Sequence, residues 1–276
     1  DWRNGRDGYA GDAIGLIAYL NATDTKGALA IARDFLGLRA MSREQRDAMR
    51  FAAEAAQKKA EAKARKDRAR KIMRAGELFA SGDRLFAPGQ AQNPAARHGL
   101  AYWAARKMPF DQIPALALEN FRFSGATEWW KGAEWKRQGD GTGERVVKIK
   151  DGPRFPAIHA AMRAWNGEIM ACHCTFLDPV KAAKAPVDLP KLMMGEARGA
   201  VIELAQGPEQ KPFWQARQAH PLILAEGIET AGPLAIAIPE CRVWAVGSIS
   251  GFAHAPGQLA PARLMFGQCR FDGVDV

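Results

Sequence analysis

The sequence predicts a mixed α+β or α/β protein that opens with helices and ends in a parallel sheet. Apolar residues recur at helical spacing within residues 13–35, and strong helix formers fill residues 42–80. From Phe155 the pattern changes to short apolar strands broken by glycine. After Leu222 the order becomes strand, helix, strand with short connections, which favours a parallel sheet with covering helices.

The first segment, GDAIGLIAYLNATDTKGALAIARDFLGL, predicts two short helices that pack as a pair. Apolar residues of the first helix repeat at helical spacing, at Ala13, Leu16, Ile17 and Leu20. Either Thr23 or Asp24 is suited to cap the second helix, which Gly37 ends.

Residues 42–80 predict one long helix with a charged, solvated surface. Ser42 and Gln45 have the spacing of a capping box, and the middle of the segment lacks large apolar residues. Two interpretations fit: a spacer, or a basic arm that lies along a phosphate backbone. The cations of such an arm would be Lys58, Lys59, Lys63, Arg65, Lys66, Arg68, Arg70, Lys71 and Arg74.

The middle of the chain combines a short helix with a segment rich in glycine, lysine and tryptophan. NPAARHGLAYWAARKM predicts a helix entered through Pro94. We expect this helix to bury Leu100, Trp103 and Ala104. Residues 128–151 predict a loop or hairpin. Its tryptophans, which either pack in the core or the hairpin or stack on nucleic-acid bases, are Trp129, Trp130 and Trp135.

The second half of the chain predicts a series of strands. FPAIHAAMRAWNGEIMACHCTFLD reads as a β-hairpin that turns at Asn166-Gly167, and a second apolar pair follows in KLMMG and GAVIEL. LILAEGIETAGPLAIAI then predicts a strand that feeds a helix. RVWAVGSISG predicts a strand that ends in small residues, and LAPARLMF predicts a final helix.

The composition constrains the partners and the compartment. The formal net charge of +9 favours a polyanionic partner, most simply nucleic acid. The four cysteines form no CxxC pair and are typical of reduced thiols in a cytoplasmic protein. No run of eighteen apolar residues occurs, and we expect neither a membrane span nor a signal peptide.

The strand LILA runs directly into Glu226 and Gly227, and the next strand ends at Gly247-Ser248. Functional groups of an open parallel sheet gather at the carboxyl ends of its strands. A carboxylate there suits a hard cation such as Mg²⁺, or proton transfer during phosphoryl chemistry. The alternative is that Glu226 is simply an acid at the positive end of the following helix.

At these residues the sequence resembles the Toprim domain, the metal-dependent fold shared by bacterial primases and topoisomerases. LILAEGIETA looks like the family's first motif, and RVWAVGSISG is similar to its second strand. Upstream, the hairpin with PKLMMG and GAVIEL resembles the subdomain that precedes Toprim in primases, where a lysine and a glycine (here Lys191 and Gly195) come before the next strand. YAGDAIGLIAYL resembles the tail of a primase zinc-ribbon domain.

The resemblance implies four regions. Residues 1–40 would be the tail of a zinc-ribbon-like domain, and 41–90 a charged helix and linker. Residues 91–215 would be the primase-core subdomain, and 216–276 a partial Toprim domain. By the resemblance, the zinc ligands would lie before Asp1. The Cys172-His173-Cys174 strand is not such a site, because alternate residues of a strand cannot close a tetrahedral shell alone.

The resemblance also assigns roles to single residues. Glu226 would be the general acid or base and a metal contact. Lys191, with Arg154 and Arg163, would bind nucleic-acid or nucleotide phosphates. Glu229 is either a supporting residue behind the site or a helix-start acid, and Gly227, Gly247 and Ser248 would support the turns. The family's Asp-x-Asp metal motif is expected beyond Val276, although Asp272 and Asp275 are candidate ligands.

These expectations describe a primase-like nucleotidyltransferase of a phage or mobile element that acts in DNA replication. It would use Mg²⁺ or Mn²⁺ to join ribonucleoside triphosphates on single-stranded DNA, with a replicative helicase as a further partner. The 276 residues alone would be inactive. Two alternatives remain open: a Toprim nuclease, and a DNA-binding accessory protein whose chemistry has lapsed.

Overall fold

The structure is a computed structural model, and its chain divides into two compact units, Asp1–Ala64 and Arg65–Val276. The boundary falls inside a long helix, α3, and each unit is described by itself. The residues that the structure describes are 11–37, 42–86, 92–108, 112–113, 118–139, 145–216 and 220–252.

The first unit contains the predicted helical pair, α1 (Ala13–Leu20) and α2 (Thr25–Phe35). Each helix is capped by an aspartate, because the side chain of Asp12 accepts from the Gly15 amide and that of Asp24 accepts from the Gly27 amide, both at 2.7 Å. Of the two candidate caps for α2, Asp24 is therefore the one used. Gly37, at a φ of +62°, follows the end of α2.

The long helix α3 (Arg43–Ala80) begins with the predicted capping box. The Ser42 amide donates to Oε1 of Gln45 at 3.0 Å, and the Gln45 amide donates to Oγ of Ser42 at 3.1 Å. Most of its side chains are exposed, as expected of a solvated helix. Only near its end are side chains buried, at Ala75 and Phe79, where α3 packs on the larger sheet.

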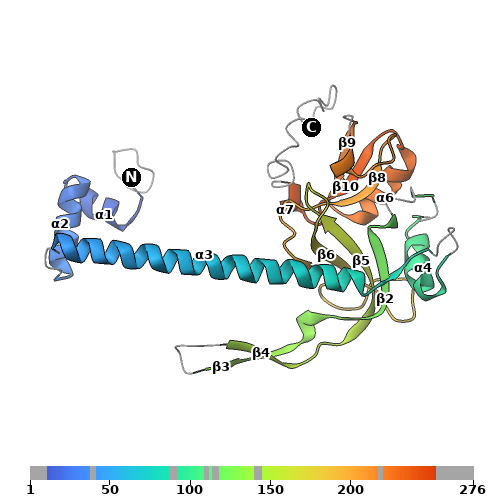
Figure 1. The fold of residues 1–276 in the computed structure, drawn as a ribbon, viewed down its shortest axis with the longest axis horizontal. Helices are drawn as coiled ribbons and strands as arrows, with labels where there is room; N and C mark the ends of the chain where they lie inside the picture. Colours follow the sequence, from blue (N-terminus) through green and yellow to red (C-terminus); the bar gives the residue numbers. More distant parts are fainter. Residues whose placement is uncertain are drawn as a thin grey trace. The chain divides into compact units, whose positions relative to one another are not determined.

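The second unit is built on a five-stranded antiparallel sheet (Figure 1). The predicted hairpin forms its centre, and Gly167 takes the positive φ of +86° that the turn requires. The strands in spatial order are β1 (Asp83–Arg84), β2 (Phe121–Glu128), β5 (Arg154–Arg163), β6 (Ile169–Phe176) and β7 (Lys191–Gly195).

Alternate residues of β5 and β6 face two different cores. Ala161, Cys172 and Cys174 pack toward the end of α3, while Ile158 and Met162 join the main core. The two cysteines thus share one buried face, as the alternation predicts, and their sulfur atoms lie 3.8 Å apart. Burial raises the pKa of the Cys174 thiol, so this thiol stays protonated.

A smaller mixed sheet follows, with the strand order β8 (Ile202–Gln206), β10 (Arg242–Ala245), β9 (Leu222–Ala225). Within the described residues only β9 and β10 are parallel, joined through α6 (Ile228–Ala237), whereas β8 is antiparallel to β10. A Toprim-like parallel sheet is therefore not seen. The short helix α7 (Ile249–Phe252) follows β10, and LAPARLMF lies outside the described residues.

KLMMG and GAVIEL are strands, but they do not pair with each other. Strand β7 pairs with β6 in the larger sheet, and β8 pairs with β10 in the smaller one. The apolar pattern identifies a strand without identifying its partner, which tertiary packing decides. Strand β8 comes before the expected boundary at residue 215 and completes the sheet that follows it.

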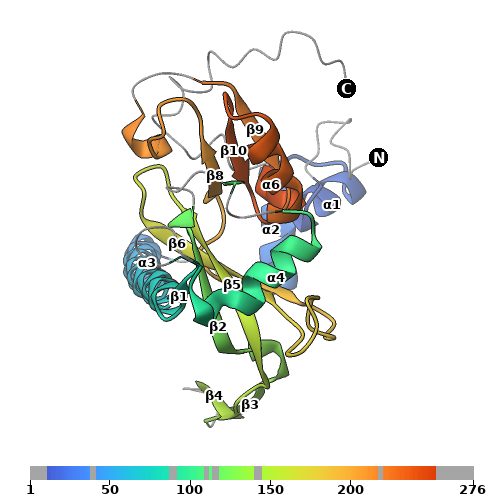
Figure 2. The same ribbon diagram turned by 90° about the vertical axis from the view of Figure 1, so that its right-hand side faces the viewer.

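Helix α6 lies on the small sheet, and α4 lies beside α6 and packs on β2 and β5 of the larger sheet (Figure 2). The 3₁₀ turn η2 (Pro94–Ala96) leads into α4 (Arg97–Ala105). Leu100 and Trp103 are buried as predicted, but the prediction for Ala104 is wrong: it is exposed, and Tyr102 is buried instead. A Cβ on Gly232 of α6 would lie 2.0 Å from Cε of Met108, so the Met108 side chain would have to move if a larger residue replaced this glycine.

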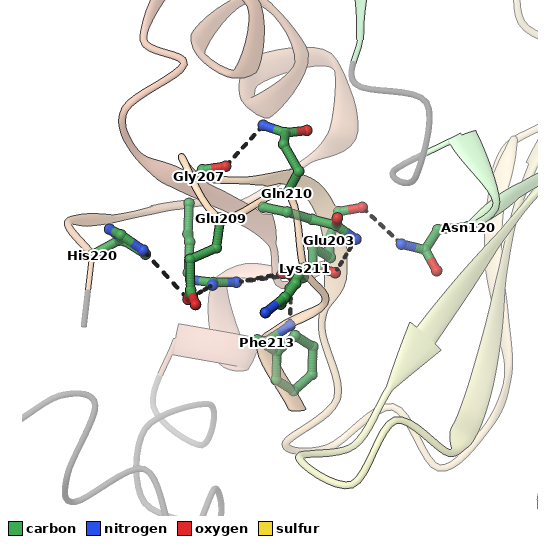
Figure 3. A network of polar contacts seen from close by, with 10 residues as sticks. Asn120, Glu203, Gly207, Glu209, Gln210, Lys211, Phe213 and His220 are labelled. Carbon is green, nitrogen blue, oxygen red and sulfur yellow. Dashed lines mark hydrogen bonds and ion pairs between the residues drawn. The ribbon is translucent and has the colours of Figure 1, made fainter. Parts of the chain in front are cut away.

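The other face of the small sheet carries the loop between β8 and β9, which contains the 3₁₀ turn η5 (Phe213–Gln215). There Glu203 and Arg242 form a buried ion pair, surrounded by hydrogen bonds from the loop (Figure 3). The Phe213 amide donates to Oε1 of Glu203 at 3.0 Å, and Nη1 of Arg242 donates to the Lys211 carbonyl at 3.1 Å. This network ties the loop to the sheet.

Residues 128–151 form the predicted hairpin as a separate two-stranded ribbon of β3 (Glu134–Gln138) and β4 (Arg145–Lys150), after the 3₁₀ turn η4 (Trp130–Gly132). The ribbon extends away from the five-stranded sheet (Figure 1). None of the helices in the described parts of the chain combines the length and apolar character needed to cross a membrane.

Candidate active site at the rim of the small sheet

The parallel strands β9 and β10 end side by side, and this end places Glu226. The Val246 amide donates to the Ala225 carbonyl at 3.0 Å, and the Gly247 amide donates to the Glu226 carbonyl at 2.8 Å. Glu226 itself is exposed, directly before α6. Its carboxylate thus has the position expected from the sequence, at the carboxyl edge of a parallel strand pair.

Gly247 has a structural reason to be glycine. Its φ is +82°, and a Cβ there would lie 3.1 Å from both Cε of Met162 and Sδ of Met193. Gly195, which ends β7, is still more constrained: at a φ of +110°, a Cβ would lie 2.3 Å from the Met170 carbonyl oxygen. Gly247 lets the small sheet approach the larger one beside the rim, whereas Gly195 lets β7 pair closely with β6.

Glu229, in the first turn of α6, gathers three side chains from distant parts of the chain. Nζ of Lys191, the first residue of β7, lies 2.7 Å from Oε2 of Glu229. Nζ of Lys184, in the loop before β7, lies 2.9 Å from Oε1. The hydroxyl of Tyr102 on α4 donates to the same carboxylate. We call these four side chains the Glu229 cluster.

The Glu229 cluster carries a surplus positive charge. Partial burial alone would raise the pKa of Glu229, but hydrogen bonds from Lys191, Tyr102 and Lys184 outweigh it and lower the pKa to about 2. Burial and the neighbouring carboxylate raise the pKa of Tyr102, so the phenol keeps its proton. Two ammonium groups therefore face one carboxylate, which leaves a net charge of about +1.

The imidazole of His173 beside this cluster adds no charge at neutral pH. Its side chain lies in β6, where burial, and secondly the charge of Lys191, lower its pKa to about 4. The surplus charge of the cluster is therefore that of the lysines alone.

Lys191 is the member of the cluster best placed to reach a ligand. About a third of its side chain is exposed (35%), and its Nζ lies 3.9 Å from where a Cβ on Gly227 would be. The ammonium group is thus close to the Glu226–Gly227 turn while Glu229 holds it in place. A partly exposed, fixed ammonium group of this kind suits a phosphate oxygen.

The described part of the chain supplies one carboxylate that fits a Mg²⁺ ion. Glu226 is an exposed oxygen donor, and Mg²⁺ is commonly held by one or two carboxylates together with waters and substrate phosphates. Glu229 does not fit, because two ammonium groups and a phenol already occupy its oxygens. No group of three or more potential metal-ligating side chains occurs among the described residues, and Asp272 and Asp275 lie outside them.

The two arginines expected to assist Lys191 lie at opposite ends of β5. This ten-residue strand rises about 3.3 Å per residue, so they are roughly 30 Å apart. Arg154 is exposed and donates to the Ala126 carbonyl at 3.2 Å. Arg163 donates to Oδ1 of Asn120 and to the Gly167 carbonyl, both at 2.8 Å. One phosphate cannot contact both arginines, whereas an extended polymer can.

The sequence prediction missed Lys184 and Tyr102. Each is distant from Glu229 along the chain, by 45 and 127 residues, and neither stands in a motif. A sequence pattern carries no signal for such contacts: the packing of α4 beside α6 creates that of Tyr102, and the loop before β7 brings in Lys184. Ser248 lies just after the rim, where its Oγ is 3.0 Å from Oγ of Ser250.

Comparison with known proteins gives one family. Residues 64–204 match the family described as a domain of unknown function, DUF7146. The chain belongs to this family. The DUF7146 match contains Tyr102, Lys184 and Lys191 and ends within β8, before Glu226 and Glu229. No curated protein and no solved structure matches the chain.

Proposed function

We propose that the chain belongs to a primase-like nucleotidyltransferase that acts on single-stranded DNA. The observation that carries this proposal is the convergence at one rim of an exposed carboxylate, Glu226, and a fixed ammonium group, Lys191. The two come from different sheets, and Glu229 holds the lysine at 2.7 Å beside the Glu226–Gly227 turn. The resemblance of LILAEGIETA to the first Toprim motif supports the same conclusion.

Each residue then has a distinct task. Lys191 binds a phosphate of the nucleotide or template, and its charge offsets the negative charge that grows on the transferring group. Glu229 is a positioning residue, because its own carboxylate is occupied by Lys191, Lys184 and Tyr102. Glu226 accepts or donates a proton at the rim, or contributes an oxygen to the metal site. When bound, Mg²⁺ neutralises triphosphate charge and lowers the pKa of the attacking hydroxyl.

The test is primer synthesis by the full-length protein on a single-stranded template with Mg²⁺ or Mn²⁺. We expect Glu226→Gln to lower the rate roughly 100-fold or more, because general acid–base or metal-binding groups contribute at least this much. Glu240→Gln is a matched control: it makes the same change at an exposed glutamate just before the opposite end of β10. Equal rates for Glu226→Gln and the wild type would remove Glu226 from the mechanism.

The basic surface of α3 favours the second candidate, a DNA-binding accessory protein without chemistry. All nine lysines and arginines between Lys58 and Arg74 are exposed, and among the described residues only Arg70 and Lys71 of these nine have ion-pair partners, Asp67 and Glu196. Such a helix would bind phosphates whether or not the rim is active. DNA binding without primer synthesis in the full-length protein would select this candidate. Degradation of labelled DNA without nucleotides would instead select the nuclease.

A further inference from the structure

We infer that the β3–β4 ribbon is a second DNA contact, which stacks unpaired bases of a single strand on Trp135. The ribbon is separate from the two main sheets and extends from the end of the five-stranded sheet where Arg154 begins β5 (Figure 1). This inference rests on the proposed function only for its choice of DNA as the polymer.

The surface of the ribbon is basic. Five of the eleven residues in its two strands are lysine or arginine, and one, Glu134, is acidic. Lys150 pairs with Glu134 at 2.9 Å, and Lys148 pairs with Glu128 and Asp151 at 2.7 and 2.8 Å. Lysine and arginine thus outnumber acidic residues in the two strands by five to one. This excess favours a polyanion over an apolar protein surface.

Trp135 differs from its two neighbours in being exposed. Trp129 is half-buried, and its indole N–H donates to the Leu189 carbonyl at 3.0 Å, while Trp130 packs edge-on against Phe176. These two tryptophans confirm the core-packing interpretation. In contrast, 54% of Trp135 is exposed. Because its ring is open to solvent, Trp135 is available to a ligand in a way that Trp129 and Trp130 are not.

The pairing register sets cations on the same face as this indole. Trp135 lies directly opposite Lys148, and Arg137, two residues further along β3, lies opposite Val146. Nζ of Lys148 lies 5.9 Å from the centre of the Trp135 ring, and two carboxylates fix that lysine. The ring is thus held on one side while more than half of its surface stays open to solvent.

A fixed aromatic ring beside cations is the arrangement that stacks bases and holds the adjoining phosphates. The bases must be unpaired, because in a duplex their faces are already stacked on neighbouring base pairs. Single-stranded DNA therefore fits the ribbon better than duplex DNA. Arg154, at the base of the ribbon, would extend the same phosphate track toward the five-stranded sheet.

The experiment measures binding of a fluorescently labelled oligothymidylate by anisotropy, in the full chain, without metal or nucleotide. We expect Trp135→Ala to weaken binding roughly 10-fold, because it removes the ring on which a base stacks, and Trp135→Phe to retain it within about 3-fold, because it keeps an aromatic ring there. Ile149→Ala is the matched control, because it truncates another exposed apolar residue (56%) of the same ribbon. This control should bind like the wild type.

Two further measurements identify the ligand. Arg137→Ala should reduce the slope of log K against log salt concentration by about 0.7, the value for one phosphate contact on a single strand. A duplex of the same length should bind more weakly than the single strand. Unchanged binding by Trp135→Ala, equal loss in Ile149→Ala, or equal binding of the duplex would each overturn the inference.

The two proposals can fail separately. Glu226→Gln should bind the oligonucleotide as tightly as the wild type while it loses primer synthesis. If Trp135→Ala weakens binding but Glu226→Gln still synthesises primers, the rim assignment is wrong and the ribbon inference stands. If Glu226→Gln loses synthesis and Trp135→Ala binds normally, the reverse holds.

Discussion

Two clusters of carboxylates and cations flank the small sheet, and they differ in their access to water. At the rim, the side chains of Glu229, Lys184 and Lys191 are 24%, 27% and 35% exposed. On the face below the β8–β9 loop, those of Glu203 and Arg242 are 0% and 3% exposed (Figure 3). The residue types are alike, so the difference in surroundings decides what each cluster does.

The surroundings shift the pKa values of Glu203 and Glu229 in opposite directions. Burial raises the pKa of Glu203 to about 7, although Gln206, Arg242 and the Phe213 amide all favour its charged form. The pKa of Glu229 falls to about 2, because its three donors outweigh its partial burial. The Glu203–Arg242 pair, which we call the closed cluster, fixes a loop on a strand. The Glu229 cluster, which we call the open cluster, holds an excess cation where a ligand can reach it.

The largest effect on stability should come from breaking the closed pair. Arg242→Met leaves the Glu203 carboxylate buried without its cation, and removal of one partner of such a pair costs about 3–5 kcal/mol. We expect a fall of this size in the free energy of unfolding, measured by urea titration. Arg198→Met, at an exposed arginine in the turn before β8, is the control and should change it by less than about 0.5 kcal/mol. A loss below about 1 kcal/mol for Arg242→Met would mean that the two charges are not coupled.

At the open cluster, the largest effect should be on ligand binding instead. Lys191→Met removes the ammonium group nearest the rim and should weaken binding of a ribonucleoside triphosphate with Mg²⁺ by about 10–100-fold, or about 1.4–2.7 kcal/mol. Titration calorimetry measures the affinity, and urea titration should show a stability change under about 1 kcal/mol. Lys181→Met, at an exposed lysine of the preceding loop, is the control. A large loss of stability with unchanged affinity would make Lys191 a structural residue.

The pH dependence of stability should separate the two carboxylates. Glu203 holds its proton more tightly in the folded chain, so its contribution is complete below about pH 4.5 and is lost as the pH rises toward about 7. The slope is at most about 1.4 kcal/mol per pH unit. Glu229 acts with the opposite sign: its contribution is present above about pH 4.5 and is lost as the pH falls toward about 2.

Conservative variants show which glutamate causes each of these two changes of stability with pH. Glu203→Gln should flatten the free energy of unfolding between about pH 4.5 and 7, and Glu229→Gln should flatten it below about pH 4.5. Chemical unfolding at a series of pH values measures both. If Glu203→Gln leaves the upper window unchanged, the carboxyl group of Glu203 titrates in the folded chain as it does when unfolded.

Some parts of the fold were predictable because a few adjacent residues in the sequence specify them. The capping box at Ser42, the turn at Asn166-Gly167 and the exposed glutamate after a strand each depend on a few adjacent residues. Strand pairing was not predictable, because β8 leaves its neighbour β7 and joins β10, which follows it by 36 residues. Alternating apolar residues specify that a strand is half-buried, not which edge it completes.

The candidate site likewise contains residues that the sequence could predict and residues that it could not. Glu226 and Lys191 were identifiable from strand ends and from the resemblance, and the contact between Glu229 and Lys191 gives Glu229 a definite task. Tyr102 was invisible, because an aromatic residue in an amphipathic helix is normally a core residue. Its ring is indeed buried, and only its hydroxyl reaches the cluster. Sequence periodicity predicts whether a residue as a whole is buried. It cannot predict that the ring of a tyrosine is buried while its hydroxyl makes a polar contact.

Tyr102→Phe isolates that hydroxyl and should have the smallest effect. The ring can keep its edge-on contact with Trp103, while Glu229 loses one of its three donors and retains both lysines. The expected loss of stability is about 0.5–1.5 kcal/mol, that of one hydrogen bond, and the affinity for nucleotide should fall by no more than about 3-fold. Thermal unfolding and calorimetry measure the two quantities. If Tyr102→Phe weakened nucleotide binding as much as Lys191→Met, the phenol itself would contact the ligand, and the open cluster would bind through its hydroxyl as well as its surplus charge.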